Sequence, residues 1–520
     1  MRSVEIILAL VVLATVVAAF AGRLRVPAPS LLVVAGLAAG LVPGVPRVEV
    51  TPEIVSLVVL PPLLYAAGQE LPLRDLRAVW RPVAVLATGL VLASAAAVAA
   101  VARAVTPLPG SMALVLGAVL ASTDPVAVSA LGRRLPLPAR LHALVQAESL
   151  FNDATSLVLF RVAVAFAAGT AGAGGWAGGI SQFALLAGGG AAVGAATAGA
   201  VALVRRRITD PVLETVVALV TPYAAYLLAE APGVSGVTSV VVASVILSSR
   251  NARLTTAQSR LQLHSVYQTV VFLLESVVFA LIGLELPAAI RELSRGEGSW
   301  PAQALAVAAT LIAVRALGVF PVLAIARRRD GTRPWPEAAV ATWAGARGVV
   351  PLAAALSIPL TSASGAPVPG RDLVLVLAAA VIVASLLGQG LTLEPLVRRA
   401  GIARPATEGR HEATLARLRT TEAALSWLEQ LAADAAAPDD MIDRLRRNLQ
   451  ARSRVLEDND GAPAPSASST AATYLRLRQG LLDAQRDELT RLHSDGEVSD
   501  ATRRRLQRQL DLEETGLADT

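Results

Sequence analysis

The chain has 520 residues, 54% hydrophobic and 17% charged, with a mean hydropathy of +0.57. A soluble globular protein carries roughly 25% charged residues, and the charges here are sparse before about residue 398 and dense after it. The formal net charge is +6, but the chain has no lysine, and most arginines before the tail stand in short loops between apolar runs. That pattern is typical of a membrane protein and argues against nucleic acid as a partner. The absence of cysteine excludes disulfides and thiol chemistry.

Glycine, proline and arginine clusters divide residues 4–397 into about thirteen apolar segments. They run approximately over 4–22, 28–43, 53–70, 82–102, 110–131, 142–168, 179–204, 211–230, 234–248, 264–288, 302–326, 336–360 and 372–397. Most are long enough to cross a bilayer, because ~20 helical residues cover the ~30 Å hydrocarbon layer. The sequence therefore predicts an all-α polytopic membrane protein with about thirteen transmembrane helices over residues 1–400.

The loop arginines predict the orientation of the chain. Those that follow odd-numbered segments are Arg23 and Arg25, Arg74, Arg77 and Arg81, Arg133, Arg134 and Arg140, Arg205–Arg207, Arg250, Arg253 and Arg260, Arg327–Arg329 and Arg333, and Arg398 and Arg399. Loops after even-numbered segments carry little net positive charge. Because arginine-rich loops stay in the cytoplasm, we expect the N-terminus outside the cell membrane and the tail inside.

The first segment has a second interpretation. Ala19-Phe20-Ala21 followed by Gly22 resembles a signal-peptide cleavage site. Cleavage there would leave Arg23 and Arg25 outside and disturb the alternation of loop charge only locally.

Two segments carry interruptions at matching places. Ser122-Thr123-Asp124-Pro125 lies within the fifth segment, where a proline removes a backbone donor and breaks the helix. Gly345-Ala346-Arg347-Gly348, followed by Pro351, interrupts the twelfth. Each is the fourth member of a set of five segments, 2–6 and 9–13. Broken helices at corresponding places in two halves indicate a transporter built from inverted repeats, with its binding site near the membrane midplane.

The sixth segment contains Glu148-Ser149-Leu150-Phe151-Asn152-Asp153 within an apolar run from about residue 144 to 168. A charge at the bilayer centre costs at least ~2.5–3.5 kcal/mol, so buried acids there usually serve ions or protons. At helical spacing Glu148 and Asn152 share one face, and Ser149 and Asp153 share the next. A structural alternative for Asp153 and Asp124 is a buried hydrogen-bonding pair. For Glu275, in the tenth segment, a transport role and a structural role are equally supported.

These motifs resemble one family. Residues 122–128 (STDPVAV), 148–153 (ESLFND), 346–348 (ARG) and 312–319 (IAVRALGV) closely resemble the sodium/proton antiporters of the NhaP and animal sodium–hydrogen exchanger branch. The likeness covers roughly residues 1–400 and keeps the order and spacing of several motifs. It implies a homodimer, an elevator-like motion and two broken helices that cross.

The resemblance implies a cation site in which Asp153 takes a cation or a proton in turn. Asp124, Ser149 and the backbone carbonyl of Thr123 would complete the oxygen ligands of Na⁺. Carboxylate, hydroxyl and carbonyl oxygens also suit a small hard cation on chemical grounds. No resident cofactor is expected, because Na⁺ and H⁺ are the transported substrates.

The resemblance implies supporting roles for four further residues. Asn152 would hold the crossing point of the broken helices, and Glu148 would pair with Arg315. Arg347 would offset the helix dipoles at the second interruption. The chain departs from the family in the third segment, where Ala66 follows Pro61-Pro62-Leu63-Leu64-Tyr65 at a position that usually carries an acid. Glu70 lies one turn later and would more naturally sit near the cytoplasmic end.

The tail, residues 401–520, mixes Arg, Asp, Glu, Leu and Ala and predicts helices. Its composition fits either a cytoplasmic regulatory or dimer-supporting domain or a solubilising appendage. It shows no phosphate-binding loop, metal-ligand cluster or nucleophile–base set, so the whole chain is not expected to be an enzyme.

We therefore expect alternating-access exchange of Na⁺ or Li⁺ for H⁺, controlling intracellular pH and sodium. The alternatives are a K⁺/H⁺ antiporter and, from another class, an ion channel or membrane sensor. Monovalent cations, protons and membrane lipid are the expected partners.

Overall fold

A computed structural model describes residues 2–24, 28–42, 55–71, 73–124, 137–168, 175–208, 210–255, 257–293, 299–327, 335–362, 365–402, 406–433, 439–461, 467–495, 497–498 and short stretches between 502 and 514. Apart from an isolated bridge between Thr361 and Pro367, regular structure in these ranges is helical. The chain divides into two compact units, Met1–Arg404 and Pro405–Thr520.

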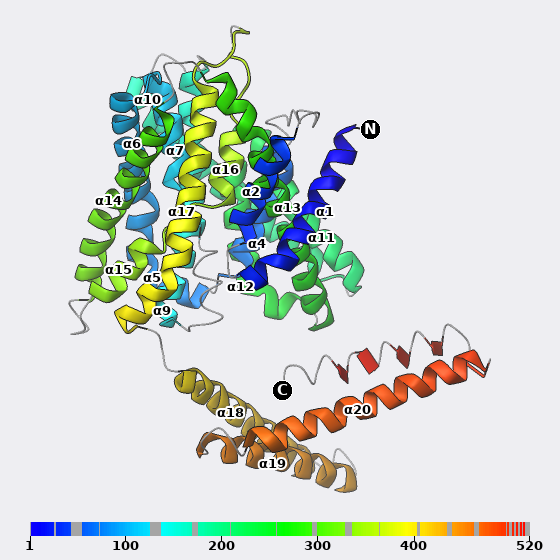
Figure 1. Ribbon diagram of the computed structural model, residues 1–520. Coiled ribbons are helices and arrows are strands. Elements are labelled where there is room, and N and C mark those ends of the chain that lie inside the picture. The colour runs from blue at the N-terminus through cyan, green and yellow to red at the C-terminus, as the bar shows by residue number, and fades with distance from the viewer. Residues whose placement is uncertain are drawn as a thin grey trace. The chain divides into compact units, whose positions relative to one another are not determined.

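The first unit is a bundle of long apolar helices (Figure 1). Its first half contains α1 (Arg2–Leu24), α2 (Ala28–Gly40), η1 (Val55–Val59), α4 (Leu60–Gln69), α5 (Leu73–Ala84), η2 (Val85–Leu90), α6 (Val91–Val105), α7 (Gly110–Ala121) and α9 (Ala139–Ala167). Its second half contains α10 (Gly175–Arg205), α11 (Pro211–Glu230), α12 (Gly236–Leu254), α13 (Ala257–Glu292), α14 (Trp300–Arg327), α15 (Trp335–Trp343), α16 (Val349–Leu356) and α17 (Arg371–Ala400).

Seven helices among the described residues are long and apolar enough to cross a membrane, and shorter apolar helices accompany them. The helical ranges overlap every predicted apolar segment, although residues 125–131 of the fifth lie outside the described residues. The all-α membrane architecture is thus confirmed, while the number of thirteen crossings stays a prediction.

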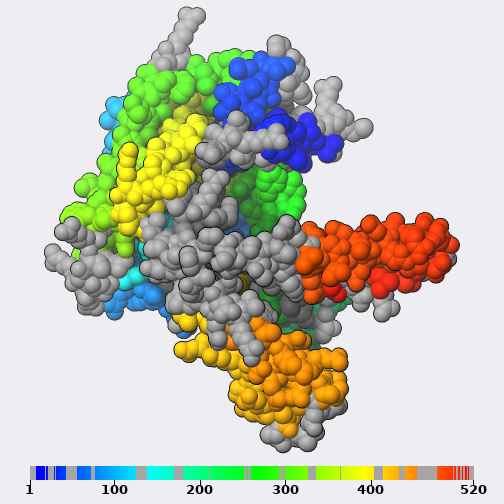
Figure 2. Space-filling model, turned by 60° about the horizontal axis from the view of Figure 1, so that its bottom comes forward, coloured from blue at the N-terminus to red at the C-terminus, as the bar shows by residue number. Residues whose placement is uncertain are grey.

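Large apolar side chains cover the outside of this unit, as a helix facing lipid requires. On α1, Leu8, Val12, Val16 and Phe20 recur every four residues and are each at least half exposed. This helix lies at the surface of the bundle, in dark blue in Figure 2. Few soluble proteins expose so continuous an apolar stripe.

Glycine allows α2 and α13 to pack backbone against backbone. A Cβ atom at Gly36 would lie 2.2 Å from the carbonyl oxygen of Ala280, and one at Gly283 would lie 2.2 Å from that of Val33. Small residues four apart, here Gly36 and Gly40, are the usual means of such close approach in membranes. We call this contact the α2–α13 seam.

Both predicted interruptions are present, and they meet. Helix α7 ends at Ala121, four residues before Pro125, and residues 122–124 are non-helical. Helices α15 and α16 are separated by residues 344–348. The backbone N–H of Asp124 donates to the carbonyl oxygen of Ala346 at 2.7 Å. Each break therefore supplies a partner for backbone groups that the other leaves without a helical bond.

The second unit contains α18 (Ala406–Ala433), α19 (Asp439–Gly461) and α20 (Ala467–Ser494). Leu428, Ile442, Leu482 and Leu489 are its buried apolar residues among those described. Its predicted cytoplasmic place and its regulatory or solubilising role stay predictions.

Candidate functional site

The breaks meet against the middle of α9, which carries the polar cluster of the sixth segment. Glu148, Ser149, Asn152 and Asp153 are all buried there. An unbroken helix satisfies its own backbone groups, so only the side chains of this cluster need partners.

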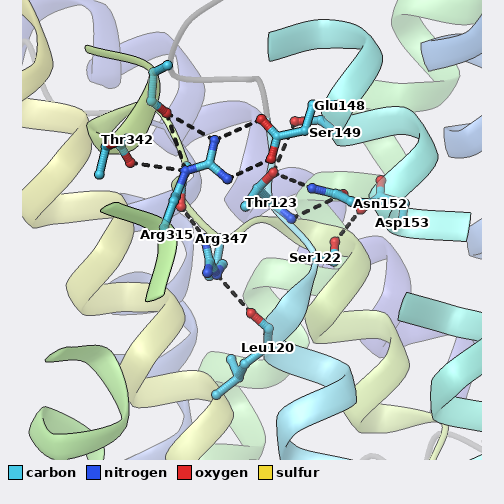
Figure 3. Close-up of polar contacts among 12 residues, drawn as sticks. Leu120, Ser122, Thr123, Glu148, Ser149, Asn152, Asp153, Arg315, Thr342 and Arg347 are labelled. Atoms are coloured by element: carbon cyan, nitrogen blue, oxygen red, sulfur yellow. Dashed lines mark hydrogen bonds and ion pairs between the residues drawn. The ribbon is translucent and has the colours of Figure 1, made fainter. Parts of the chain in front are cut away.

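Asn152 ties α9 to the non-helical stretch after α7. Its Nδ2 donates to Thr123 Oγ1 at 2.6 Å, and its Oδ1 accepts from the Thr123 N–H at 3.3 Å. Ser149 Oγ lies 3.3 Å from the same hydroxyl. Figure 3 shows these side chains converging on Thr123. The amide therefore sits beside the meeting point of the breaks.

Asp153 contacts the same non-helical stretch at Ser122, the residue before Thr123. The Ser122 hydroxyl donates to its Oδ1 (Figure 3). Ser122 belongs to the Ser122-Thr123-Asp124-Pro125 motif, and neither the motif nor the family resemblance predicts a role for it. The available signal was its place beside the break, where an extended backbone turns a short hydroxyl toward the neighbouring helix.

Glu148 and Arg315 form a buried, bidentate ion pair. Arg315 Nη1 donates to Glu148 Oε1 at 2.7 Å and Nη2 to Oε2 at 3.0 Å, and both side chains are at most 3% exposed. Arg315 Nε also donates to the Thr342 carbonyl at 3.1 Å, and Nη2 to that of Ala341 at 3.0 Å. The guanidinium thus joins α9, α14 and the negative end of α15.

Arg347 lies within the second break and reaches the end of α7. Its Nε donates to the Leu120 carbonyl at 2.9 Å, and its Nη1 donates to the Gly345 carbonyl. The family resemblance implies that Arg347 acts at the break of the twelfth segment. Its side chain serves the carbonyl end of α7 as well.

A cavity of about 710 Å³ reaches this junction. Asp153, Asp124 and Thr123 line it, while Ser149 does not. Ala66, Glu70 and Glu275 also line it, so two more carboxylates face the same space. A single sequence cannot reveal this convergence, since the residues lie far apart along the chain. Gln146 Nε2 donates to Glu70 Oε2 at 3.4 Å, which places Glu70 toward the start of α9.

Gly348 leaves room for the Asp124 carboxylate. A Cβ atom at Gly348 would lie 1.4 Å from Asp124 Oδ2, although the backbone there (φ −127°) suits any residue. We predict that Gly348→Ala displaces this carboxylate and lowers the exchange rate on the order of 100-fold. Exchange by purified protein in vesicles measures the effect. Gly388→Ala is the matched control, because a Cβ atom there meets nothing within 4 Å. Equal rates for the two variants would contradict the prediction.

Comparisons with known proteins identify the family of the chain. The family model described as "Sodium/hydrogen exchanger, transmembrane" matches residues 8–399. The chain belongs to the sodium/hydrogen exchanger family. Members of this family are transporters and not enzymes. The family assignment therefore excludes the ion-channel and membrane-sensor alternatives.

Known exchangers match over most of their length. The chain is 36% identical to an uncharacterized Na⁺/H⁺ exchanger of Mycobacterium tuberculosis over 99% of this chain and 96% of that protein. It is 31% identical to the Na⁺/H⁺ antiporter ApNhaP of Aphanothece halophytica over 73% of this chain and 70% of that protein. The fold matches the sodium proton antiporter MjNhaP1 of Methanocaldococcus jannaschii with a TM-score of 0.65, at 21% identity over 77% of this chain and 99% of that one.

Proposed function

We propose that this exchanger moves Na⁺ against H⁺ by alternating access at a site formed by Asp153, Asp124, Ser149 and Thr123. The observation that carries the proposal is that the buried Asp153 lines a cavity that also reaches Asp124. A proton and a cation compete for the Asp153 carboxylate, so each excludes the other and no separate coupling device is needed. Exchange of this kind controls intracellular pH and sodium.

The remaining residues support the site in this proposal. Asn152 holds the junction of the breaks, the Glu148–Arg315 pair fixes α9 against α14 and α15, and Arg347 offsets the carbonyl ends at the breaks. The hydrogen bonds among these buried polar groups favour a single geometry at the junction.

The proposal also covers the oligomeric state of the protein, its membrane and its orientation. The protein works as a homodimer in the cell membrane, with its N-terminus outside and its tail in the cytoplasm. The loop arginines support this orientation. Glu70, Arg260 and His264 line the cavity toward that arginine-bearing end, so the cavity opens to the cytoplasm.

Exchange of K⁺ for H⁺ is the second candidate, and one observation favours it. Ala66 lines the cavity where the family resemblance leads us to expect an acid, so the wall from α4 offers no carboxylate there. Fewer charged ligands give a weaker field, and the strength of that field is one source of selection between Na⁺ and K⁺.

Cation-evoked collapse of a preset pH gradient in proteoliposomes tests both candidates. We expect Na⁺ and Li⁺ to dissipate the gradient at micromolar to millimolar concentrations and K⁺ to do so weakly. A response to K⁺ alone would support the same exchange mechanism with K⁺, and not Na⁺, as the transported cation. No response to any cation between pH 6 and pH 9 would contradict exchange by this chain.

A further inference from the structure

A second polar cluster lies on α9, beyond Asp153. Arg161 stands eight residues after Asp153 and reaches across to α11. Its Nη2 donates to Glu230 Oε1 at 2.5 Å and to the Tyr226 hydroxyl at 3.0 Å. The guanidinium carbon lies 5.9 Å from the centre of the Tyr226 ring. None of these residues touches the proposed cation site.

The acceptor is fixed by the turn between α11 and α12. Glu230 Oε1 also accepts from the Gly236 N–H at 3.0 Å, at the start of α12. A Cβ atom at Gly236 would lie 2.7 Å from that oxygen and 2.7 Å from the Tyr226 ring, so only glycine leaves the carboxylate its place. A carboxylate at a helix N-terminus is favourably placed. Glu230 therefore belongs rigidly to α11 and α12, whereas its cationic partner belongs to α9.

The cluster and the cavity lie on opposite sides of Asp153. Gln146, which contacts the cavity residue Glu70, precedes Asp153 on α9, and Arg161 follows it. A rise of 1.5 Å per residue puts Arg161 about 12 Å farther along the helix from Asp153. The cavity thus reaches Asp153 from one side, and on the other side the Arg161–Glu230 pair joins α9 to α11.

We propose that Arg161 and Glu230 form a latch that closes the transport site on the side away from the cavity, and that the latch opens whenever that side is exposed. The proposal rests on alternating access at Asp153. For the site to face the other side, α9 must shift by several ångströms relative to α11 and α12. A 2.5 Å ion pair does not survive such a shift, so the pair favours the state in which the cavity is open.

The absence of native cysteine gives a direct readout. Ala67 lines the cavity, so Ala67→Cys in the full chain reports its openness by reaction with a membrane-impermeant maleimide in proteoliposomes. In Arg161→Gln or Glu230→Gln we expect labelling to slow by roughly two- to fivefold, because a partly exposed ion pair is worth up to about a fivefold shift in an equilibrium. Ser494→Cys in the tail is the control, and its labelling rate should not change in either variant.

The double variant decides whether the two residues act as one pair. Arg161→Gln/Glu230→Gln should label at the same reduced rate as each single variant, and Tyr226→Phe should slow labelling less. Unchanged labelling at Ala67→Cys, or additive slowing in the double variant, would overturn the latch. Labelling requires no transport, so loss of the latch and loss of the proposed exchange are separate results.

Discussion

Asp153→Asn should abolish cation-evoked proton exchange while the protein still reaches the membrane in normal amount. Asparagine keeps the size of the side chain and an oxygen that can accept the Ser122 hydroxyl, so the junction of the breaks should persist. An amide cannot ionise, however, and it therefore can neither release a proton to an incoming cation nor neutralise that cation. We expect exchange to fall to the level of protein-free vesicles.

The measurement is collapse of a preset pH gradient by Na⁺, Li⁺ and K⁺, made on wild type and variant reconstituted at equal amounts. Glu394→Gln provides the control, since Glu394 is an exposed acid that pairs with Arg398 one turn along α17. That variant should exchange at the wild-type rate. Full exchange by Asp153→Asn would remove Asp153 from the mechanism.

Glu148→Gln should give the largest loss of stability among single charge removals in the helical bundle. The substitution leaves the buried Arg315 guanidinium with carbonyl acceptors but no counter-charge. Removing one member of a buried pair costs about 3–5 kcal/mol in proteins generally. We expect a low yield from the membrane and a lower midpoint of thermal unfolding in detergent, measured by the fraction that remains monodisperse after heating.

A double variant separates two causes of the stability loss: the Arg315 charge left without a counter-charge, and the lost hydrogen bonds of the ion pair. Glu148→Gln/Arg315→Gln strands no charge and should recover part of the stability. Recovery should be incomplete, because Arg315 also serves the carbonyls of Ala341 and Thr342. Breaking the exposed Glu394–Arg398 pair should change stability by less than about 1 kcal/mol. An unchanged midpoint for Glu148→Gln would mean that the pair contributes little.

The sequence predicted most of the helical architecture, because hydrocarbon imposes length and apolarity on every spanning helix. It also predicted both breaks, since Pro125 and the glycines around Arg347 are local signals. The meeting of the breaks rests on the Asp124–Ala346 contact between positions more than two hundred residues apart. No local pattern encodes such a contact, and only the family resemblance anticipated it.

Side-chain surroundings were harder to predict than helices. Arg205 counted among the loop arginines, yet it ends α10 with only 1% of its side chain exposed. The position of an arginine in the sequence predicts that it lies near a loop. It does not predict whether its long side chain points into solvent or packs against neighbouring helices. Glu275 could be given no role from its sequence position, and only the fold brings it to the cavity. A buried charge needs a partner of opposite sign, but only the family resemblance named Arg315 as the partner of Glu148.

The α2–α13 seam restricts one wall of the cavity. Helix α13 supplies Tyr267, Val271 and Glu275 to the cavity, and its backbone rests directly on that of α2 at Gly36 and Gly283. Two backbones in contact have no side-chain layer between them to repack, so we expect this wall to keep its shape. We therefore expect changes of cavity shape to arise where α7, α9 and the second break meet, because side chains that can exchange partners hold them together.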